Sequence, residues 1–417
     1  MRSTRPEDPR RRRRAATDRW LYRLGAGAVA LALGLLGLML AAILIASVPA
    51  FTQTTVRVEF YIDPALVSAA DPAAGDFRAV VARGAAGLLP DAPPREARAA
   101  ARVPTPAAPH LVRRAVLADP GMIGRHVVLT LPAADAFDQL ARGHVDRAAP
   151  EAARRLNDAE IAAFDQLVAA GKVAWALNVG LLTNHDSRFP EMAGLAGALA
   201  GSAMALAICL ALSLPIGIGT AILLEELAPR TRLTAVIEAN INNLAAVPPI
   251  VFGLLGLAIF IAGLGLPRSS PLVAGMVLAL MTLPTVVIGT RLALRRVPSA
   301  IREAGFAVGA SRHQVVLHHV LPLALPGILT GAIAAVAQAL GEAAPLLIIG
   351  MSAFLTSGPY TPTDAATTLP TQILLWADGP EAGFVARAAA AILVLLLLLV
   401  ALNALAVLLR LRAERRR

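Results

Sequence analysis

Cysteine and lysine are almost absent from this sequence, whose 417 residues include one of each, Cys209 and Lys172. A single cysteine excludes an intramolecular disulfide, so any domain outside a membrane must be stable without a covalent link. Cys209 lies inside an apolar run, where it is best interpreted as a small packing residue. The Walker A pattern Gly-x-x-x-x-Gly-Lys-Ser/Thr is also absent, so we expect no ATP hydrolysis by P-loop chemistry in this chain.

Charged residues are scarce at 16%, whereas hydrophobic residues make up 57% of the chain. Soluble domains are usually about 45–50% apolar. The excess is collected into six runs long enough to cross a bilayer, for which about 20 apolar residues suffice. The composition therefore predicts an all-α polytopic membrane protein with six transmembrane helices, near 24–48, 192–224, 241–263, 271–290, 323–350 and 385–410.

The net charge of +10 is concentrated at the two ends of the chain. Residues 1–23 carry nine Arg against three acidic residues, and 410–417 carry five Arg against one Glu. The positive-inside rule therefore places the Arg-rich N-terminus 1–23 and the tail 411–417 in the cytoplasm. This distribution favours topology anchors over a nucleic-acid-binding surface.

The loops between the runs agree with this orientation. Arginines gather in 225–240 and 291–322, whereas 264–270 has one and 351–384 has none. The first two loops are therefore predicted to be cytoplasmic and the other two external.

The first run determines whether the segment that follows it, 51–190, stays attached to the membrane. Run 24–48 has about 25 residues, more than the about 7–15 of a secretory h-region, so we interpret it as a retained transmembrane helix 1. Cleavage near 46–50 is the alternative. With the anchor retained, 51–190 forms a periplasmic domain between helices 1 and 2, about 140 residues long.

Segment 51–190 has the pattern of a mixed α/β domain. Apolar residues alternate with polar ones from Val56 to Ile62, which predicts a half-buried strand. Asn157 and Glu160 are spaced as a helix capping box. The segment has fifteen basic and fifteen acidic residues, and we find no metal-ligating or catalytic cluster in it.

Stretch 298–322 predicts two short helices around a turn. Ser299 can cap the first helix, Gly309 can take the left-handed stop conformation, and Ser311 with Gln314 can cap the second. Pro322 limits the second helix and opens the next span. The first helix carries an apolar stripe at helical spacing, Ile301, Ala304, Gly305 and Val308. Periodicity alone leaves two interpretations open, a surface for a cytoplasmic partner or a helix lying on the membrane. Metal binding by the nearby histidines 313, 318 and 319 is disfavoured, because no cysteine lies close to them.

The spacing in this stretch resembles the EAA loop of ABC-importer permeases. Glu303-Ala304-Gly305 is followed by three residues, Gly309, nine residues and His319-Val320-Leu321-Pro322, with Gly305 and His319 departing from the usual types. The resemblance implies an importer permease whose 291–322 loop carries a coupling helix for a cytoplasmic ABC ATPase dimer, which holds the ATP and Mg. It also implies a sister permease and a periplasmic binding protein as partners. The coupling residues that it implies are Glu303, Ala304, Gly305, Gly309, Leu321 and Pro322.

Three further stretches are similar to the PstA-type phosphate permeases. They are Asn243-Leu-Ala-Ala-Val-Pro-Pro-Ile-Val-Phe-Gly-Leu-Leu-Gly256, the run from Leu283 to Pro298, and Ala339-Leu-Gly-Glu-Ala-Ala-Pro-Leu-Leu347. The resemblance covers about 190–410 and implies that 191–410 is the permease domain for inorganic phosphate. Segment 51–190 resembles an extension found in a subset of these permeases.

Three polar residues are candidates for the translocation pathway. Glu342 is an ionisable residue within a span, which marks a functional position unless an interhelical hydrogen bond satisfies it or it lies near the end of the span. Gln338 stands one turn earlier, where the resembling family usually has Arg. Asn243 is the third candidate, although it can also cap a span.

Two alternatives to phosphate import remain open. The absence of Arg at position 338 leaves room for another oxyanion, such as sulfate, molybdate or phosphonate. A membrane receptor that senses through 51–190 is the other; it predicts a cytoplasmic signalling domain, whereas we expect only six residues after Leu411 there.

Overall fold

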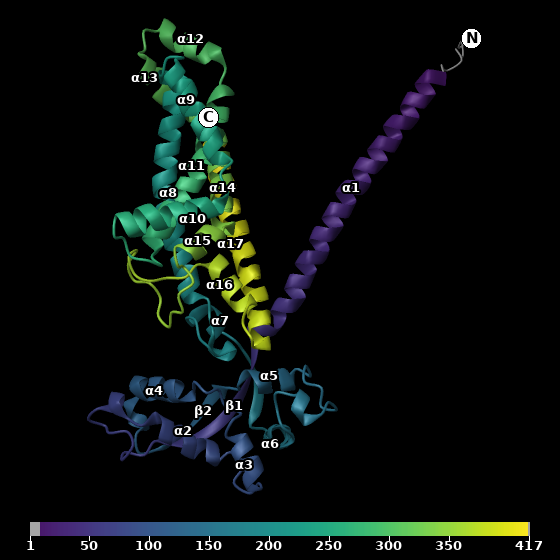
Figure 1. Cartoon of the computed structure of the whole chain (residues 1–417), viewed down its shortest axis with the longest axis vertical. Coiled ribbons are helices and arrows are strands. Elements are labelled where there is room, and N and C mark those ends of the chain that lie inside the picture. Colours follow the sequence, from purple (N-terminus) through teal and green to yellow (C-terminus); the bar gives the residue numbers. More distant parts are fainter. Residues whose placement is uncertain (1–8, 416–417) are drawn as a thin grey trace.

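The computed structural model of the chain describes residues 9–415. Figure 1 shows a bundle of long helices with a smaller α/β unit at one end. The ends of the Arg-rich termini, 1–8 and 416–417, lie outside the described residues.

Five helical segments are long and apolar enough to cross a membrane, within residues 9–415. The helices in them are α1 (Pro9–Ser47), α8 (Ala196–Ile222), α11 (Pro271–Arg295), α14 (Leu321–Gly341) and α17 (Ala382–Arg415). α11 is the most buried and packs between α8 and α14. Five of the six predicted spans therefore form largely as expected.

The span predicted at 241–263 is wrong as a single straight helix. It is divided between α9 (Arg232–Ala245) and α10 (Pro249–Leu255), which continues as the π-helix η7 (Gly256–Gly263), and the two parts are bent by 105°. The break falls at Val247-Pro248-Pro249, because proline lacks the amide donor and disfavours helical backbone in the residue before it. Figure 1 shows α10 running across the bundle rather than along it.

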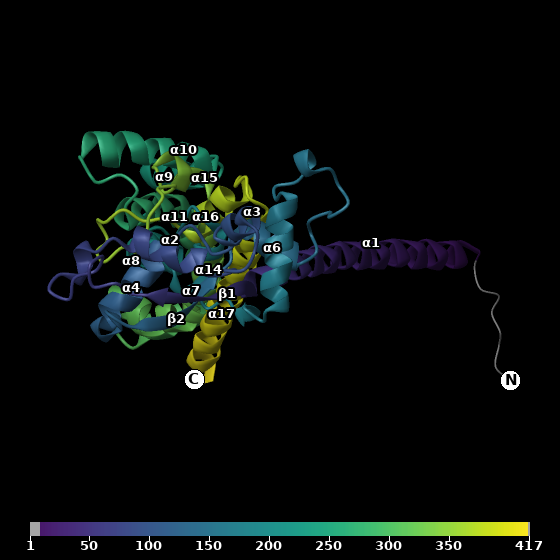
Figure 2. The same cartoon turned by 90° about the horizontal axis from the view of Figure 1, so that it is seen from below.

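α1 diverges from the other helices. It contacts α17 and η1 (Val48–Phe51), and Figures 1 and 2 show the rest of the helix pointing away from the bundle. From Trp20 to Ile45 its large apolar side chains are exposed, apart from the half-buried Ile43, as in a helix that faces lipid or another subunit.

Glycines allow close packing at several points of the bundle. A Cβ on Gly201 of α8 would meet the backbone oxygen of Thr367 at 2.1 Å, so this glycine accommodates a loop. One close contact between spans is at Gly289 of α11 and Gly331 of α14, where an added Cβ would lie 3.0 Å from the facing Cα.

The α/β unit is built on a three-stranded antiparallel sheet of order β2-β1-β3. β1 (Thr52–Tyr61) pairs with β2 (His126–Pro132) and with β3 (Val173–Leu177). β1 confirms the predicted strand: Val56, Val58 and Phe60 are fully buried in the core of the unit. The predicted capping box also forms, at the start of α6 (Asp158–Ala169).

Short helices complete the unit and the bundle. Those of the unit are η2 (Pro72–Ala74), α2 (Phe77–Ala86), α3 (Pro94–Ala100), α4 (Ala108–Ala118), η3 (Pro120–Met122), α5 (Asp135–Ala141), η4 (Glu151–Ala153), α7 (Gly180–Thr183) and η5 (Pro190–Met192). Those of the bundle are the π-helix η6 (Leu223–Leu227), α12 (Ser299–Ala307), α13 (Arg312–Val315), the π-helix η8 (Val316–Val320), α15 (Ala344–Ile348) and α16 (Leu369–Ala377).

The unit is fixed against the first turns of α17. A Cβ on Gly383 would meet Asp135 Oδ1 at 2.2 Å, so glycine is needed where α17 passes α5. Arg155 donates to the Pro380 oxygen at 2.8 Å, and Arg387 is 6% exposed. The orientation of the unit is therefore coupled to the last span.

Candidate functional site: the loop between α11 and α14

The loop folds as two short helices, α12 and α13, as the sequence predicts. Gly309 has φ +83°, which confirms the left-handed stop. Ser311 and Gln314 form the predicted capping box, with hydrogen bonds of 2.8 and 3.4 Å. Ser299 does not cap α12: Pro298 is the cap residue, and Ser299 is the first residue of the helix.

Pro322 lies in the first turn of α14 and so opens the next span as expected, but it does not interrupt the helical run. A helical run continues from Arg312 to Gly341. The residues directly before the proline form the wider turn of η8. Since proline cannot donate to the carbonyl one turn back, a wider turn at this point lets the helix pass through it.

One face of α12 packs against α13, and the opposite face is exposed. Gly305 is buried, and a Cβ there would lie 2.8 Å from Val315 Cγ2, so α12 and α13 approach closely at this point. Glu303 and Ala304 are exposed, as are Phe306 at 48% and Val308 at 82%. Half of the predicted stripe thus faces away from the rest of the chain, at the end of the bundle opposite the α/β unit (Figure 1).

An ion pair ties α12 to η6, the π-helix that directly follows α8. Arg302 donates to both carboxylate oxygens of Glu226, at 2.5 and 3.1 Å, and to the backbone oxygens of Leu294 and Val297. The hydrogen bond to Glu226 raises the pKa of Arg302 above its ordinary value, so the guanidinium stays charged. α12 is therefore attached to α8 and α11 through one side chain.

A second set of charges lies beside the first. Glu225 accepts from Arg291 at 3.2 Å and from Arg295 at 2.8 Å, and Arg291 also pairs with Glu238 of α9. Neither cluster is among the predictions from the sequence. Their signal was two adjacent glutamates at the end of an apolar run, next to loops rich in arginine.

The pathway candidates lie on different helices. Gln338 of α14 accepts a hydrogen bond from Thr285 of α11 at 2.8 Å. Glu342 follows α14 with φ −89° and ψ 117°, so the helix stops at this residue inside the predicted span. Asn243 is exposed near the end of α9, and within residues 9–415 no hydrogen bond joins it to either of the others. Their role in translocation stays a prediction.

Two family descriptions match the chain. Residues 213–415 match the "Binding-protein-dependent transport system inner membrane component", and residues 8–151 match a domain of unknown function, DUF3333. The second match covers α1 and much of the α/β unit.

Individual relatives are also transport permeases. "Phosphate transport system permease protein PstA 1" of Mycobacterium tuberculosis (strain CDC 1551 / Oshkosh) is 34% identical over 226 residues, which are 54% of this chain and 73% of the relative. PstA of Yersinia pestis is 33% identical over 213 residues, 51% of this chain and 71% of the relative. "Probable ABC transporter permease protein YqgI" of Bacillus subtilis is 32% identical over 187 residues, 45% and 60% of the two chains.

Among solved structures, an inward-facing MetNI methionine ABC transporter matches with a TM-score of 0.41 and 18% identity, covering 53% of this chain and 94% of the other. The sequence matches define the class: this multi-pass membrane protein is a permease subunit of an ABC importer. Within that class, the chain belongs to the PstA-type permeases.

Proposed function

We propose that this chain carries inorganic phosphate across the inner membrane together with a sister permease, a cytoplasmic ABC ATPase dimer and a periplasmic phosphate-binding protein. The proposal is supported by the phosphate permeases among its relatives and by the resemblance of the loop at 298–322. The observation that carries the proposal is the exposed face of α12. This helix is also ion-paired to the bundle.

In this mechanism the partner ATPase holds ATP and Mg²⁺, and the chain itself needs no cofactor. Closure of the ATPase dimer moves α12, where Glu303, Ala304 and Gly309 lie on or next to the docking face. The Glu226–Arg302 pair passes this movement to α8, while the hydrogen bonds of Arg302 to the α11–α12 connection pass it to α11. The spans then rock between inward-open and outward-open states.

The docking of a cytoplasmic ATPase on α12 implies an orientation for the chain. α12 and both termini then lie in the cytoplasm. The α/β unit lies in the periplasm, since α12 and this unit are at opposite ends of the bundle (Figure 1). A binding protein then delivers its anion on the side of the α/β unit.

The substrate is the finer part of the proposal. Gln338 is neutral and has its carbonyl oxygen bound to Thr285, which leaves its amide group to donate to an oxyanion. With no Arg at this position, the sister permease supplies the compensating positive charge. The same observation favours the second candidate, a permease for another oxyanion such as sulfate, molybdate or a phosphonate.

Uptake of radiolabelled phosphate by cells that depend on this importer tests both parts. Glu303→Arg places a repulsive charge on the docking face and is expected to abolish uptake. Glu151→Arg makes the same charge change at an exposed residue of the α/β unit and is the matched control. Normal uptake by Glu303→Arg refutes the coupling role, and competition by sulfate, molybdate or methylphosphonate as strong as that by unlabelled phosphate refutes the substrate.

A further inference from the structure

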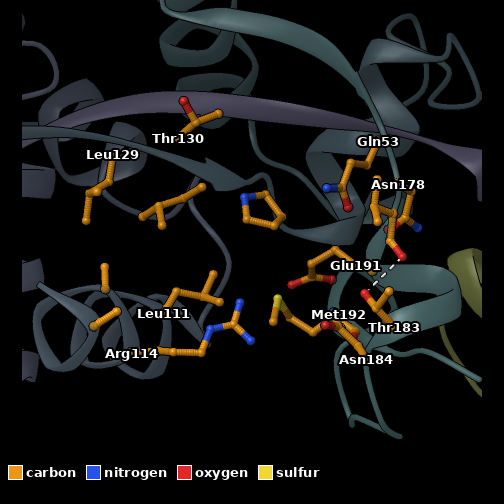
Figure 3. Close-up of a pocket in the computed structure, with 16 residues that line it drawn as sticks. Gln53, Leu111, Arg114, Leu129, Thr130, Asn178, Thr183, Asn184, Glu191 and Met192 are labelled. Carbon is orange, nitrogen blue, oxygen red and sulfur yellow. Dashed lines mark hydrogen bonds between the residues drawn. The ribbon is translucent and has the colours of Figure 1, made fainter. Parts of the chain in front are cut away.

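A cavity of about 490 Å³ lies in the α/β unit, between the sheet and the segment that leads into α8. Its walls come from α4, from the ends of β1 and β2, from residues 178–184 and from η5 (Figure 3). This volume is within the about 300–1,000 Å³ typical of sites for small ligands.

The cavity is adjacent to the ends of two membrane spans. Asn178, in its wall, donates from its backbone to the Phe51 oxygen and from its side chain to the Ala50 oxygen, both at 2.9 Å. Phe51 is the last residue of the first span. Asn184, in the same wall, accepts from the amide of Ala196, where α8 begins. These contacts hold the wall at the level where both spans leave the bilayer.

The same segment carries an exposed apolar rim. Leu177 is 75% exposed, Val179 66% and Leu182 48%. Large apolar side chains beside the end of a span are suited to the acyl-chain boundary of a membrane. Val179 belongs to both the rim and the cavity wall, so a molecule bound in the cavity can extend over the rim to the lipid.

Among the polar side chains that line the cavity, a cationic one lies opposite two that can accept hydrogen bonds. Figure 3 shows the Arg114 guanidinium pointing into the middle of the cavity, with Gln53 and Glu191 on the opposite wall. In the described part of the chain, Arg114 has no ion-pair partner, and the buried Gln53 Oε1 accepts no hydrogen bond. Glu191 is 6% exposed and accepts from Thr105 at 2.6 Å.

We propose that this cavity binds the headgroup of a membrane phospholipid. The phosphodiester anion pairs with Arg114, and an ammonium or hydroxyl group of the headgroup donates to Gln53 and Glu191. The glycerol and acyl chains pass over Val179 and Leu182 into the bilayer. The inference rests on α1 and α8 spanning a membrane and does not depend on which ion the importer carries.

Such a lipid bridges two parts of the molecule. It contacts α4 of the α/β unit and, on the other side, the segment that runs into α8. The lipid therefore stabilises the position of the unit over the membrane surface.

The test is photo-crosslinking with a phosphatidylethanolamine that carries a photoactivatable group near its headgroup. The full chain, co-purified with its partner subunits, is placed in nanodiscs, and crosslinked peptides are mapped by mass spectrometry. Crosslinks are expected within 111–118 and 178–192. Arg114→Gln should reduce them about tenfold, because the neutral amide cannot replace the charge-assisted hydrogen bonds of the guanidinium to a phosphodiester.

Arg113→Gln is the matched control: Arg113 is the neighbouring exposed arginine on α4 and donates to Ala73 instead of lining the cavity. Equal crosslinking of the two variants, both with wild-type thermal unfolding, overturns the proposal. Millimolar inorganic phosphate or glycerol phosphate is the second arm. If either removes the crosslinks as Arg114→Gln does, the cavity is a site for a free anion and the lipid assignment is wrong.

Discussion

Arg302 on α12 and Glu226 on η6, the continuation of α8, are joined by two charge-assisted hydrogen bonds, although 76 residues separate them in the sequence. The Glu226 side chain is 8% exposed and that of Arg302 23%, so the pair is shielded from water. Because the pair joins a loop helix to a span, it is a structural link rather than a surface contact.

Replacing Arg302 by Gln should uncouple the loop. The change leaves the Glu226 carboxylate buried without a cation, and removing one partner of a buried pair costs about 3–5 kcal/mol. The partial exposure of Arg302 puts the expected cost near the lower end of that range. We expect phosphate uptake, normalised to the amount of protein in the membrane, to fall about tenfold or more.

Arg230→Gln is the control, since Arg230 is an exposed arginine in the loop after α8. Exchanging the charges, with Glu226→Arg and Arg302→Glu together, should recover part of the uptake that either change removes alone. If Arg302→Gln and Arg230→Gln transport equally well, the pair does not carry the coupling.

Gly305→Ala tests the close approach of α12 and α13. The new Cβ would lie 2.8 Å from Val315 Cγ2, and overpacking of this kind costs about 1–3 kcal/mol. Uptake should fall several-fold, although Ala is the usual residue in the resembling loops. Val315→Ala makes room for the methyl group, so the double variant should transport better than Gly305→Ala. A Gly305→Ala variant with wild-type uptake would mean that Val315 moves aside freely.

The loop could be predicted from the sequence because its signals are local. The positive φ of Gly309 and the box of Ser311 and Gln314 each depend on residues within one turn, and both are present. The alternation around Val58 identified β1 for the same reason. The prediction that Ser299 caps α12 was wrong, because Pro298, directly before it, occupies the cap position.

What could not be predicted depends on distant partners. Glu225 and Glu226 pair with arginines that lie 66 to 76 residues further along the chain, and hydropathy gives no register between those segments. The proline pair at Pro248 and Pro249 was visible, but a run of apolar residues on both sides suggested one span rather than two segments at 105°. Tertiary packing decides whether such a pair kinks a helix or divides it.

Impermeant thiol labelling tests the proposed orientation. Cys209 is the single cysteine and is buried, so Cys209→Ser provides a cysteine-free parent. Ala304→Cys in this parent should react with an impermeant maleimide in inside-out vesicles and not in intact spheroplasts. Val128→Cys, at a residue 63% exposed on β2, should show the opposite pattern. Labelling of Ala304→Cys in intact spheroplasts would place α12 outside the cell and refute the coupling mechanism.

The stability of the α/β unit should depend on pH through Glu191. Burial raises the pKa of this carboxyl above its ordinary value of 4.5, so the folded state binds the proton more strongly than the unfolded chain does. The stabilisation is complete below about pH 4.5 and is lost as the pH rises through the folded-state pKa. Glu191→Gln retains the shape of the side chain but cannot ionise. The thermal midpoint of the purified full chain should therefore fall less between about pH 4.5 and pH 7 in this variant than in the wild type.

Glu151→Gln removes an exposed carboxyl of the same unit and should leave the wild-type pH dependence unchanged. Parallel pH profiles for Glu191→Gln and the wild type would show that the buried carboxyl is ionised to the same extent in the folded and unfolded states.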